Sequence, residues 1–160
     1  MARMKSEPPS RGHARGRQAG RQINHRLTQM TQMNMIEEEY KYADITRRII
    51  GCAMRVHNKL GSGFQEVIYQ RALVLEMREE DLAFEREKEM PIIYNEIQIG
   101  TRRVDFLVEG VVMVELKAIT EITDINRAQI INYLEAYKLN IGLLINFGQK
   151  RLEFKRFINS

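Results

Sequence analysis

Two charged residues stand within an otherwise apolar segment, VVMVELKA, over residues 111–118. Its two-residue alternation predicts a strand with Val111, Met113, Glu115 and Lys117 on one face. Burying an unpaired charge is costly, so Glu115 and Lys117 need partners if this strand lies inside the protein. The alternative is that the strand emerges into solvent here and that both charges are simply hydrated.

A second acid, Asp105, lies within RRVDFLVEG, where strand propensity favours almost any other residue type. In an antiparallel hairpin, Asp105 can face Glu115 if the connecting turn has three residues centred on Gly110. A two-residue turn at Glu109-Gly110 would instead send the two acids to opposite faces. A joint site therefore requires the three-residue turn or a bulge.

A third acid, Glu66, lies in the first turn of a helix predicted from about Phe64 to Glu80. A helix N-terminus favours a carboxylate, and Ser62 with Gln65 resembles a capping box, so a purely structural role is the alternative. Three carboxylates that converge near one lysine need a counter-cation, and Mg²⁺ or Mn²⁺ is the usual one. Such a metal activates water and neutralises charge on a phosphate, so the predicted chemistry is phosphodiester hydrolysis.

The elements that position these acids alternate between helical and strand periodicity. A helix is predicted over residues 44–60, with Asp44 as its cap, followed by the helix that carries Glu66. Strands follow, with a hairpin turn near Asn95-Glu96. A further helix, which Thr123 or Asp124 can cap, then extends to about Leu139. A buried strand, IGLLINF, and an edge strand, RLEFKRFI, come last. This order predicts an α/β fold with a central mixed sheet flanked by helices.

The chain has 160 residues, 44% of them hydrophobic, which is enough for one domain with one core, in which we expect Tyr69 and Tyr94. Its one cysteine, Cys52, excludes an internal disulfide framework and a cysteine-based zinc site. We see neither a long apolar run nor an export signal, so we expect an intracellular, cytoplasmic protein, with association with the nucleoid as a variant of that location.

The net charge of +4 is distributed unevenly. Residues 1–36 hold seven basic residues and one acid, whereas residues 37–160 hold 18 basic and 20 acidic residues. We therefore predict a disordered basic extension over residues 1–40 and a folded domain over residues 41–160. The extension could be an arm that contacts nucleic acid, an organelle-targeting segment or a segment with neither role. Translation from Met30, Met33 or Met35 is a further alternative.

Around Glu66 the segment GFQEVIY, over residues 63–69, has the pattern G-x-x-E-x-x-Y. VHNKLGSG precedes it, RVDFLVE and VELKA follow, and AQIINYL and GLLINFG come after these. With these motifs in this order, the chain resembles the GxxExxY protein family of the PD-(D/E)XK nuclease-like superfamily. The resemblance covers residues 45–157 and implies a restriction-endonuclease-like αβββαβ core.

The resemblance also implies roles for the acidic residues. Asp105 with the segment Glu115-Leu116-Lys117 resembles the D…E-x-K motif, and Glu66 resembles the acidic residue of the preceding helix. The implied ligands of Mg²⁺ or Mn²⁺ are Glu66, Asp105, Glu115 and the carbonyl of Leu116. Lys117 would assist the attacking water.

Two further groups of residues are candidates for contact with a substrate. Gln129 and Tyr133 are four residues apart on a helix face and resemble the Q-x-x-x-Y motif of RecB-like and lambda-exonuclease-like members. Packing of Tyr133 against the sheet is the alternative. Arg48, Arg55 and Lys59 line one edge of the first helix and are candidate contacts to a nucleic-acid backbone, with a solvated helix face as the alternative.

Two functions fit these observations. The first is a Mg²⁺- or Mn²⁺-dependent nuclease that cleaves DNA or RNA. The second is a catalytically silent nucleic-acid-binding or protein-interaction module that keeps the nuclease fold. The excess of acidic residues in residues 37–160 slightly favours the second function. A nuclease with this charge would need another source of affinity for nucleic acid, such as the basic arm, a homodimer or a protein partner. A third alternative is a non-nuclease metal hydrolase of a small phosphorylated substrate, but the sequence has no dedicated phosphate loop such as a P-loop to support it. No membrane association is expected.

Overall fold

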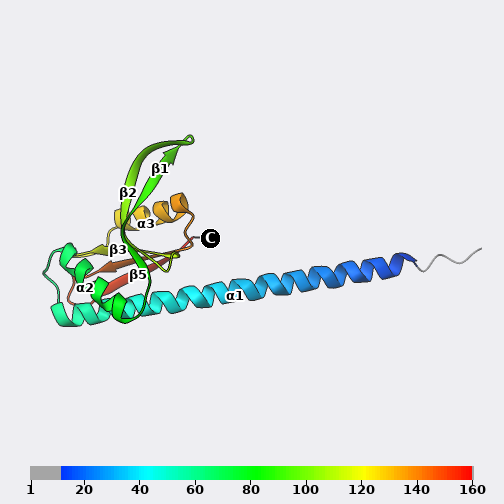
Figure 1. Ribbon diagram of the computed structural model, residues 1–160, viewed down its shortest axis with the longest axis horizontal. Coiled ribbons are helices and arrows are strands. Elements are labelled where there is room, and N and C mark those ends of the chain that lie inside the picture. The colour runs from blue at the N-terminus through cyan, green and yellow to red at the C-terminus, as the bar shows by residue number, and fades with distance from the viewer. Residues whose placement is uncertain (1–11, 160) are drawn as a thin grey trace, which may run out of the picture. The chain divides into compact units, whose positions relative to one another are not determined.

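The computed structural model describes the backbone of residues 12–17 and the complete residues 18–159. Within these residues, three helices and five strands follow one another (Figure 1). They are α1 (Gly12–Leu60), α2 (Glu66–Glu79), β1 (Phe84–Tyr94), β2 (Ile97–Val108), β3 (Val112–Lys117), α3 (Asp124–Tyr137), β4 (Ile141–Asn146) and β5 (Glu153–Ile158). The chain divides into two compact units between Tyr40 and Lys41.

The second unit is built around one mixed sheet with the strand order β1-β2-β3-β4-β5. β3 and β4 are parallel, because α3 carries the chain back between them, and the other neighbouring strands are antiparallel. The expected α/β class with a mixed, helix-flanked sheet is confirmed. β5 lies at one edge of the sheet, as predicted, and β1 lies at the other.

The two faces of the sheet are covered by different helices. On one face, the second-unit part of α1 and α2 pack against alternate residues of β3, namely Val112, Val114 and Leu116. On the other face, Met113 of β3 belongs to a smaller cluster with Ile130 and Leu134 of α3. The predicted alternation is therefore confirmed within β3, and it places the side chain of Glu115 on the face that α3 covers. Val111, which was predicted to share that face, lies in the turn before β3 and packs against the cluster on the other face.

The turn between β2 and β3 has the length that a joint acidic site requires. Val108 pairs with Val112, so three residues connect the strands, and Gly110 is the middle one. Glu109 and Gly110 have φ values of 51° and 68°, and the amide of Val111 donates to the carbonyl of Val108. The predicted three-residue turn is confirmed, and this register brings Asp105 level with Glu115.

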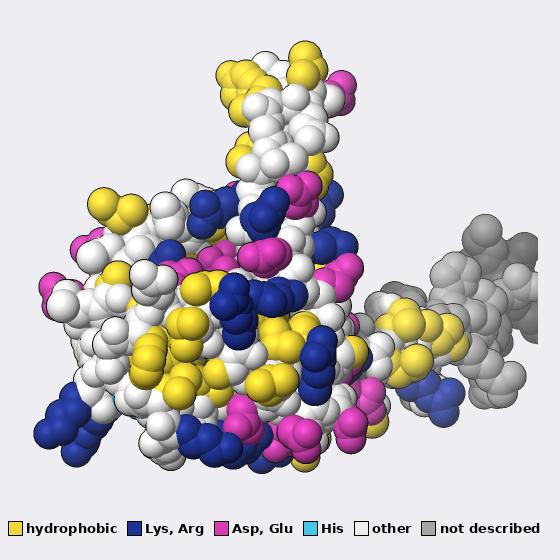
Figure 2. Space-filling view, turned by 60° about the vertical axis from the view of Figure 1, so that its left-hand side comes forward, with side chains coloured by type: hydrophobic (Ala, Val, Ile, Leu, Met, Phe, Trp, Pro, Cys, Tyr) yellow, Lys and Arg dark blue, Asp and Glu magenta, His cyan; other side chains and the backbone are white. Residues whose placement is uncertain are grey.

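β1 and β2 form a long hairpin whose tip is apolar and exposed. Tyr94 pairs with Ile97, and the positive φ values of Asn95 and Glu96 confirm the predicted turn. Figure 2 shows hydrophobic side chains gathered at this tip, where Ile93, Tyr94, Ile97 and Ile99 are each more than half exposed. The prediction that Tyr94 belongs to the core is wrong, because the hairpin extends beyond the clusters that the helices cover. Tyr69 is fully buried, as expected.

α1 is much longer than its apolar periodicity predicts. It begins at Gly12 rather than near Asp44, and Asp44 pairs with Arg47 at 2.7 Å instead of capping a helix. Residues 12–40, which we expected to be disordered, are helical because Arg, Gln, Met, Ala and Glu, all good helix formers, are frequent there. Residues 1–11 of the predicted extension lie outside the described residues. Of the helices in the described part of the chain, none is long and apolar enough to cross a membrane.

The starts of α2 and α3 differ in how they are capped. α2 begins at Glu66 without a side-chain cap, so the capping box predicted for Ser62 and Gln65 is wrong. α3 begins after Thr123, whose side chain accepts from the amide of Asn126, while the Asn126 side chain accepts from the Thr123 amide. Of the two predicted candidates, Thr123 and Asp124, this reciprocal arrangement identifies Thr123 as the cap.

Candidate active site

Asp105 stands where the ladder between β2 and β3 ends. The last backbone pair is Phe106 with Val114, and the Asp105 side chain continues the connection: its Oδ2 accepts from the amide of Leu116 at 2.7 Å. Its Oδ1 accepts from Gln70 Nε2 at 3.1 Å. Both carboxylate oxygens therefore have partners, one on β3 and one on α2.

Gln70 links Asp105 to Arg86, and both Gln70 and Arg86 are site residues that the sequence analysis missed. The Gln70 side chain is buried, and its carbonyl oxygen accepts from Arg86 Nε at 3.0 Å and from Arg86 Nη2 at 2.6 Å. A signal for Gln70 was present, since it shares a helical stripe with the apolar Leu73, Val74 and Met77, where a polar residue needs a buried partner. No local pattern marks Arg86.

Glu115 is the most deeply buried acid of the site. It lies beside Leu144 in the ladder, it is 4% exposed, and its Oε1 is buried with no hydrogen-bond partner in the described part of the chain. Burial and, after it, the nearby Asp105 charge raise its pKa from 4.5 to about 8, while Arg102 and Lys117 act in the opposite direction. A buried carboxylate with an unpartnered oxygen is costly unless a cation balances its charge or a proton neutralises it.

Glu66 and Lys117 complete an electrostatically coupled group with these two acids. Glu66 is half-buried at the first position of α2, and burial, followed by the Asp105 charge, raises its pKa, while Lys117 lowers it. Lys117 is half-buried at the end of β3, paired with Asn146. Within residues 18–159, however, no three His, Cys, Asp or Glu side chains form a ready-made metal site. The structure thus brings Glu66 and Glu115 each within electrostatic reach of Asp105 and Lys117, but these residues do not form a complete set of metal ligands.

Arg102 connects this group to α3 and was also missed by the sequence analysis. Its guanidinium lies over the ring of Tyr133, 5.1 Å from the ring centre, and its Nε is buried with no hydrogen-bond partner among the described residues. Its charge also acts on Glu66 and Glu115. Tyr133 is half-buried against the α3-side cluster, and Gln129, one turn earlier, is half-buried as well. No sequence motif distinguishes Arg102 from its neighbour Arg103.

The three candidate backbone contacts on α1 face Glu76 of α2 and Glu80, the residue that follows α2. Arg55 binds Glu76 at 2.8 Å and Glu80 at 2.9 Å, and Lys59 binds Glu76 at 3.3 Å. Arg48 donates to the backbone carbonyl of Glu80. The hydrogen bond from Arg55 lowers the pKa of Glu76. These cations join α1 to α2.

A mixed sheet that carries Asp105 on one strand and Glu115-Leu116-Lys117 on the next is the arrangement of a nuclease-like α/β fold. The family model of the PD-(D/E)XK nuclease superfamily matches residues 43–157, and the chain belongs to this superfamily. Its members are in general nucleases or related phosphodiesterases.

The other comparisons add less. The crystal structure of SSO0001 has a TM-score of 0.46 and 16% sequence identity to this chain. The similarity covers 58% of this chain and 50% of that one, so this chain matches about half the length of that structure. No curated protein matches the chain.

Proposed function

We propose that the chain is a metal-dependent nuclease that hydrolyses phosphodiester bonds of DNA or RNA, and that it belongs to the GxxExxY family within its superfamily. The observation that carries the proposal is the buried carboxylate of Glu115, which has an unpartnered oxygen and lies close to the charges of Asp105 and Lys117. A buried group of this kind is costly unless it has a function that uses its charge.

The residues present fit Mg²⁺ or Mn²⁺. Glu66, Asp105, Glu115 and the Leu116 carbonyl would hold the ion, and all four supply the hard oxygen ligands that these cations prefer. Oε1 of Glu115 is available, whereas Oδ1 of Asp105 would exchange its hydrogen bond from Gln70 for the metal. When bound, such an ion acts as a Lewis acid and lowers the pKa of a bound water.

The cationic and polar side chains have separate roles in the proposed reaction. Lys117 orients the attacking water and neutralises charge that develops on the phosphate. Arg102, whose guanidinium lies over the ring of Tyr133, contacts a phosphate oxygen. Gln129 and Tyr133 contact the substrate from α3, and the hydroxyl of Tyr133 donates a hydrogen bond to a phosphate.

The proposal is tested by metal binding and cleavage measured together. Mg²⁺ and Mn²⁺ are titrated calorimetrically into the wild type and into Glu115→Gln, which preserves side-chain shape and removes the charge. A panel of single- and double-stranded DNA and RNA is then incubated with the wild type and with Lys117→Ala. Lys155→Ala, at an exposed lysine of β5, is the matched control.

We expect metal binding to be lost in Glu115→Gln, and metal-dependent cleavage to be lost in Lys117→Ala but kept in Lys155→Ala. Removal of a catalytic proton-transfer or charge-stabilising group costs about two to four orders of magnitude in rate. Cleavage that persists unchanged in both Glu115→Gln and Lys117→Ala would overturn the proposal.

A second function, nucleic-acid binding without turnover, is favoured by one observation. Both oxygens of Asp105 are already hydrogen-bonded, to Gln70 and to the Leu116 amide, as they would be in a purely structural role. This alternative predicts binding of nucleic acid that is independent of metal and unchanged in Glu115→Gln.

A further inference from the structure

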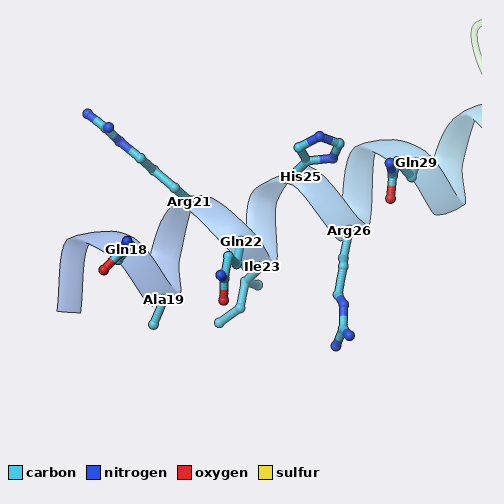
Figure 3. A pocket seen from close by; sticks show the side chains of 8 residues that line it. All are labelled: Gln18, Ala19, Arg21, Gln22, Ile23, His25, Arg26 and Gln29. Atoms are coloured by element: carbon cyan, nitrogen blue, oxygen red, sulfur yellow. The ribbon is translucent and has the colours of Figure 1, made fainter. Parts of the chain in front are cut away.

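Arg86 is an exposed cation that binds a buried side chain. In the first unit, by contrast, Arg21 and Arg26 extend from opposite sides of α1, and every side chain from residue 18 to residue 40 is exposed (Figure 3). Arg86 lies on β1 at the surface of the second unit, yet its guanidinium donates through Nε and Nη2 to the side-chain oxygen of the buried Gln70. The proposed reaction so far gives neither Arg86 nor Gln70 a role.

The orientation of the Gln70 amide follows from its two partners. A guanidinium only donates hydrogen bonds, so Arg86 can bind the oxygen of the carboxamide but not its nitrogen. Oδ1 of Asp105 accepts, and the amide nitrogen of Gln70 donates to it at 3.1 Å. The reverse orientation would place donor against donor at Arg86 and acceptor against acceptor at Asp105. Arg86 therefore fixes which end of Gln70 faces the candidate site.

Backbone pairing alone does not hold the side chain of Asp105. The ladder between β2 and β3 ends at Phe106, and Glu87, which is level with Asp105 in the register of β1 and β2, has a left-handed φ of 50°. Hydrogen bonds to the Asp105 side chain take over here: the Leu116 amide holds Oδ2 and Gln70 holds Oδ1. The direction of Oδ1 is thus set by α2, through Gln70.

The helix that holds Asp105 also carries Glu66. Gln70 follows Glu66 by one helical turn, so both side chains lie on the same face of α2. The charge of Asp105 raises the pKa of Glu66, which means that the two acids repel each other in the metal-free chain. The hydrogen bond from Gln70 opposes this repulsion, because it holds Oδ1 of Asp105 toward α2.

We propose that Gln70 is a positioning residue of the metal site and that Arg86 acts through it. The inference rests on the proposed function, since it assumes that Asp105 and Glu66 bind a metal. Gln70 holds Asp105 in place before the ion arrives and gives up Oδ1 when the ion binds. Such partners of metal ligands typically contribute about 10- to 100-fold to metal affinity.

Calorimetric titration of Mn²⁺ into the full-length chain tests the positioning role. Gln70→Leu removes the donor to Asp105 and should raise the dissociation constant by about 10- to 100-fold. Arg86→Met leaves the Gln70 amide free to turn and should raise the constant by up to the same factor. Arg86→Lys keeps one donor for Gln70 and should stay close to the wild type. Arg71→Met, at an exposed arginine of α2, is the matched control for the lost charge and should leave the constant unchanged.

A double variant tests whether Arg86 acts through Gln70. If it does, Gln70→Leu combined with Arg86→Met should bind Mn²⁺ no more weakly than Gln70→Leu alone. Additive losses would overturn this dependence. Urea unfolding confirms that each variant is folded during the titration, and Arg86→Met, at an exposed residue, decides the question if Gln70→Leu does not fold.

The same titration separates this inference from the proposed function. Unchanged or tighter Mn²⁺ binding in the folded Gln70→Leu and Arg86→Met variants would overturn the positioning role and leave the nuclease proposal standing. Tighter binding in particular would mean that the Gln70 hydrogen bond only competes with the metal. A wild-type chain that binds no metal would overturn both proposals.

Discussion

Replacement of Glu115 by glutamine should change how the stability of the metal-free protein depends on pH. In the folded chain, burial raises the pKa of Glu115 to about 8, whereas in the unfolded chain it returns to 4.5. Between these two values the folded chain holds a proton that the unfolded chain has released. The free energy of unfolding of the wild type therefore falls as the pH rises through this window. Glu115→Gln cannot lose this proton and lacks the decline.

The size of the effect follows from the same two pKa values. Each pKa unit corresponds to about 1.4 kcal/mol. The wild type should thus lose up to about 4 kcal/mol relative to Glu115→Gln between pH 4.5 and pH 8. Below this window the two proteins should be nearly equal, because both carry a neutral side chain at position 115.

Urea unfolding in the presence of a chelator, repeated from pH 5 to pH 9, measures this difference. Glu135→Gln, at an exposed glutamate of α3, is the control and should follow the wild type throughout. Parallel stability curves for the wild type and Glu115→Gln would refute the reasoning, because they would mean that Glu115 is ionised and satisfied in the folded chain. With saturating Mg²⁺, the wild-type decline should become smaller, since a bound cation favours the ionised carboxylate.

Two further substitutions test the packing around the site. Tyr69→Phe should lower the free energy of unfolding by about 1–2 kcal/mol in urea unfolding, because the hydroxyl donates to the Gly61 carbonyl at 2.7 Å inside the core; no change would mean that water replaces this bond. Gly148→Ala should cost about 3 kcal/mol or more, since the new methyl would lie 2.2 Å from the carbonyl oxygen of Ile119. Gly100→Ala has open space and should stay within about 0.5 kcal/mol, so equal thermal shifts for the two glycine variants would contradict this account.

Interactions between near neighbours could be predicted from the sequence. Alternation assigned Glu115 and Met113 to one face of β3, and the requirement for a three-residue turn at Gly110 set the register with Asp105. Thr123 was predictable as a cap because its partner, Asn126, is three residues away. In each case the partners are close along the chain, so local geometry constrains them.

The start of α1 shows where local patterns fail. The segment before Asp44 lacks apolar periodicity over most of its length, and its charge and composition favoured disorder. Its individual residues are nevertheless good helix formers, and a helix that already exists after residue 44 extends into them without a new nucleation step.

What the sequence alone determined is the class of the protein: the motifs around Glu66, Asp105 and Glu115, the mixed α/β architecture and the acidic character of the site. Only the tertiary structure decided which side chains surround these acids. Gln70 joins Asp105 to Arg86, and Arg102 lies over Tyr133. These partners come from different elements, and their meeting depends on how helices pack on the sheet. When two contacting side chains are far apart in the sequence, the local pattern around one of them does not identify the other.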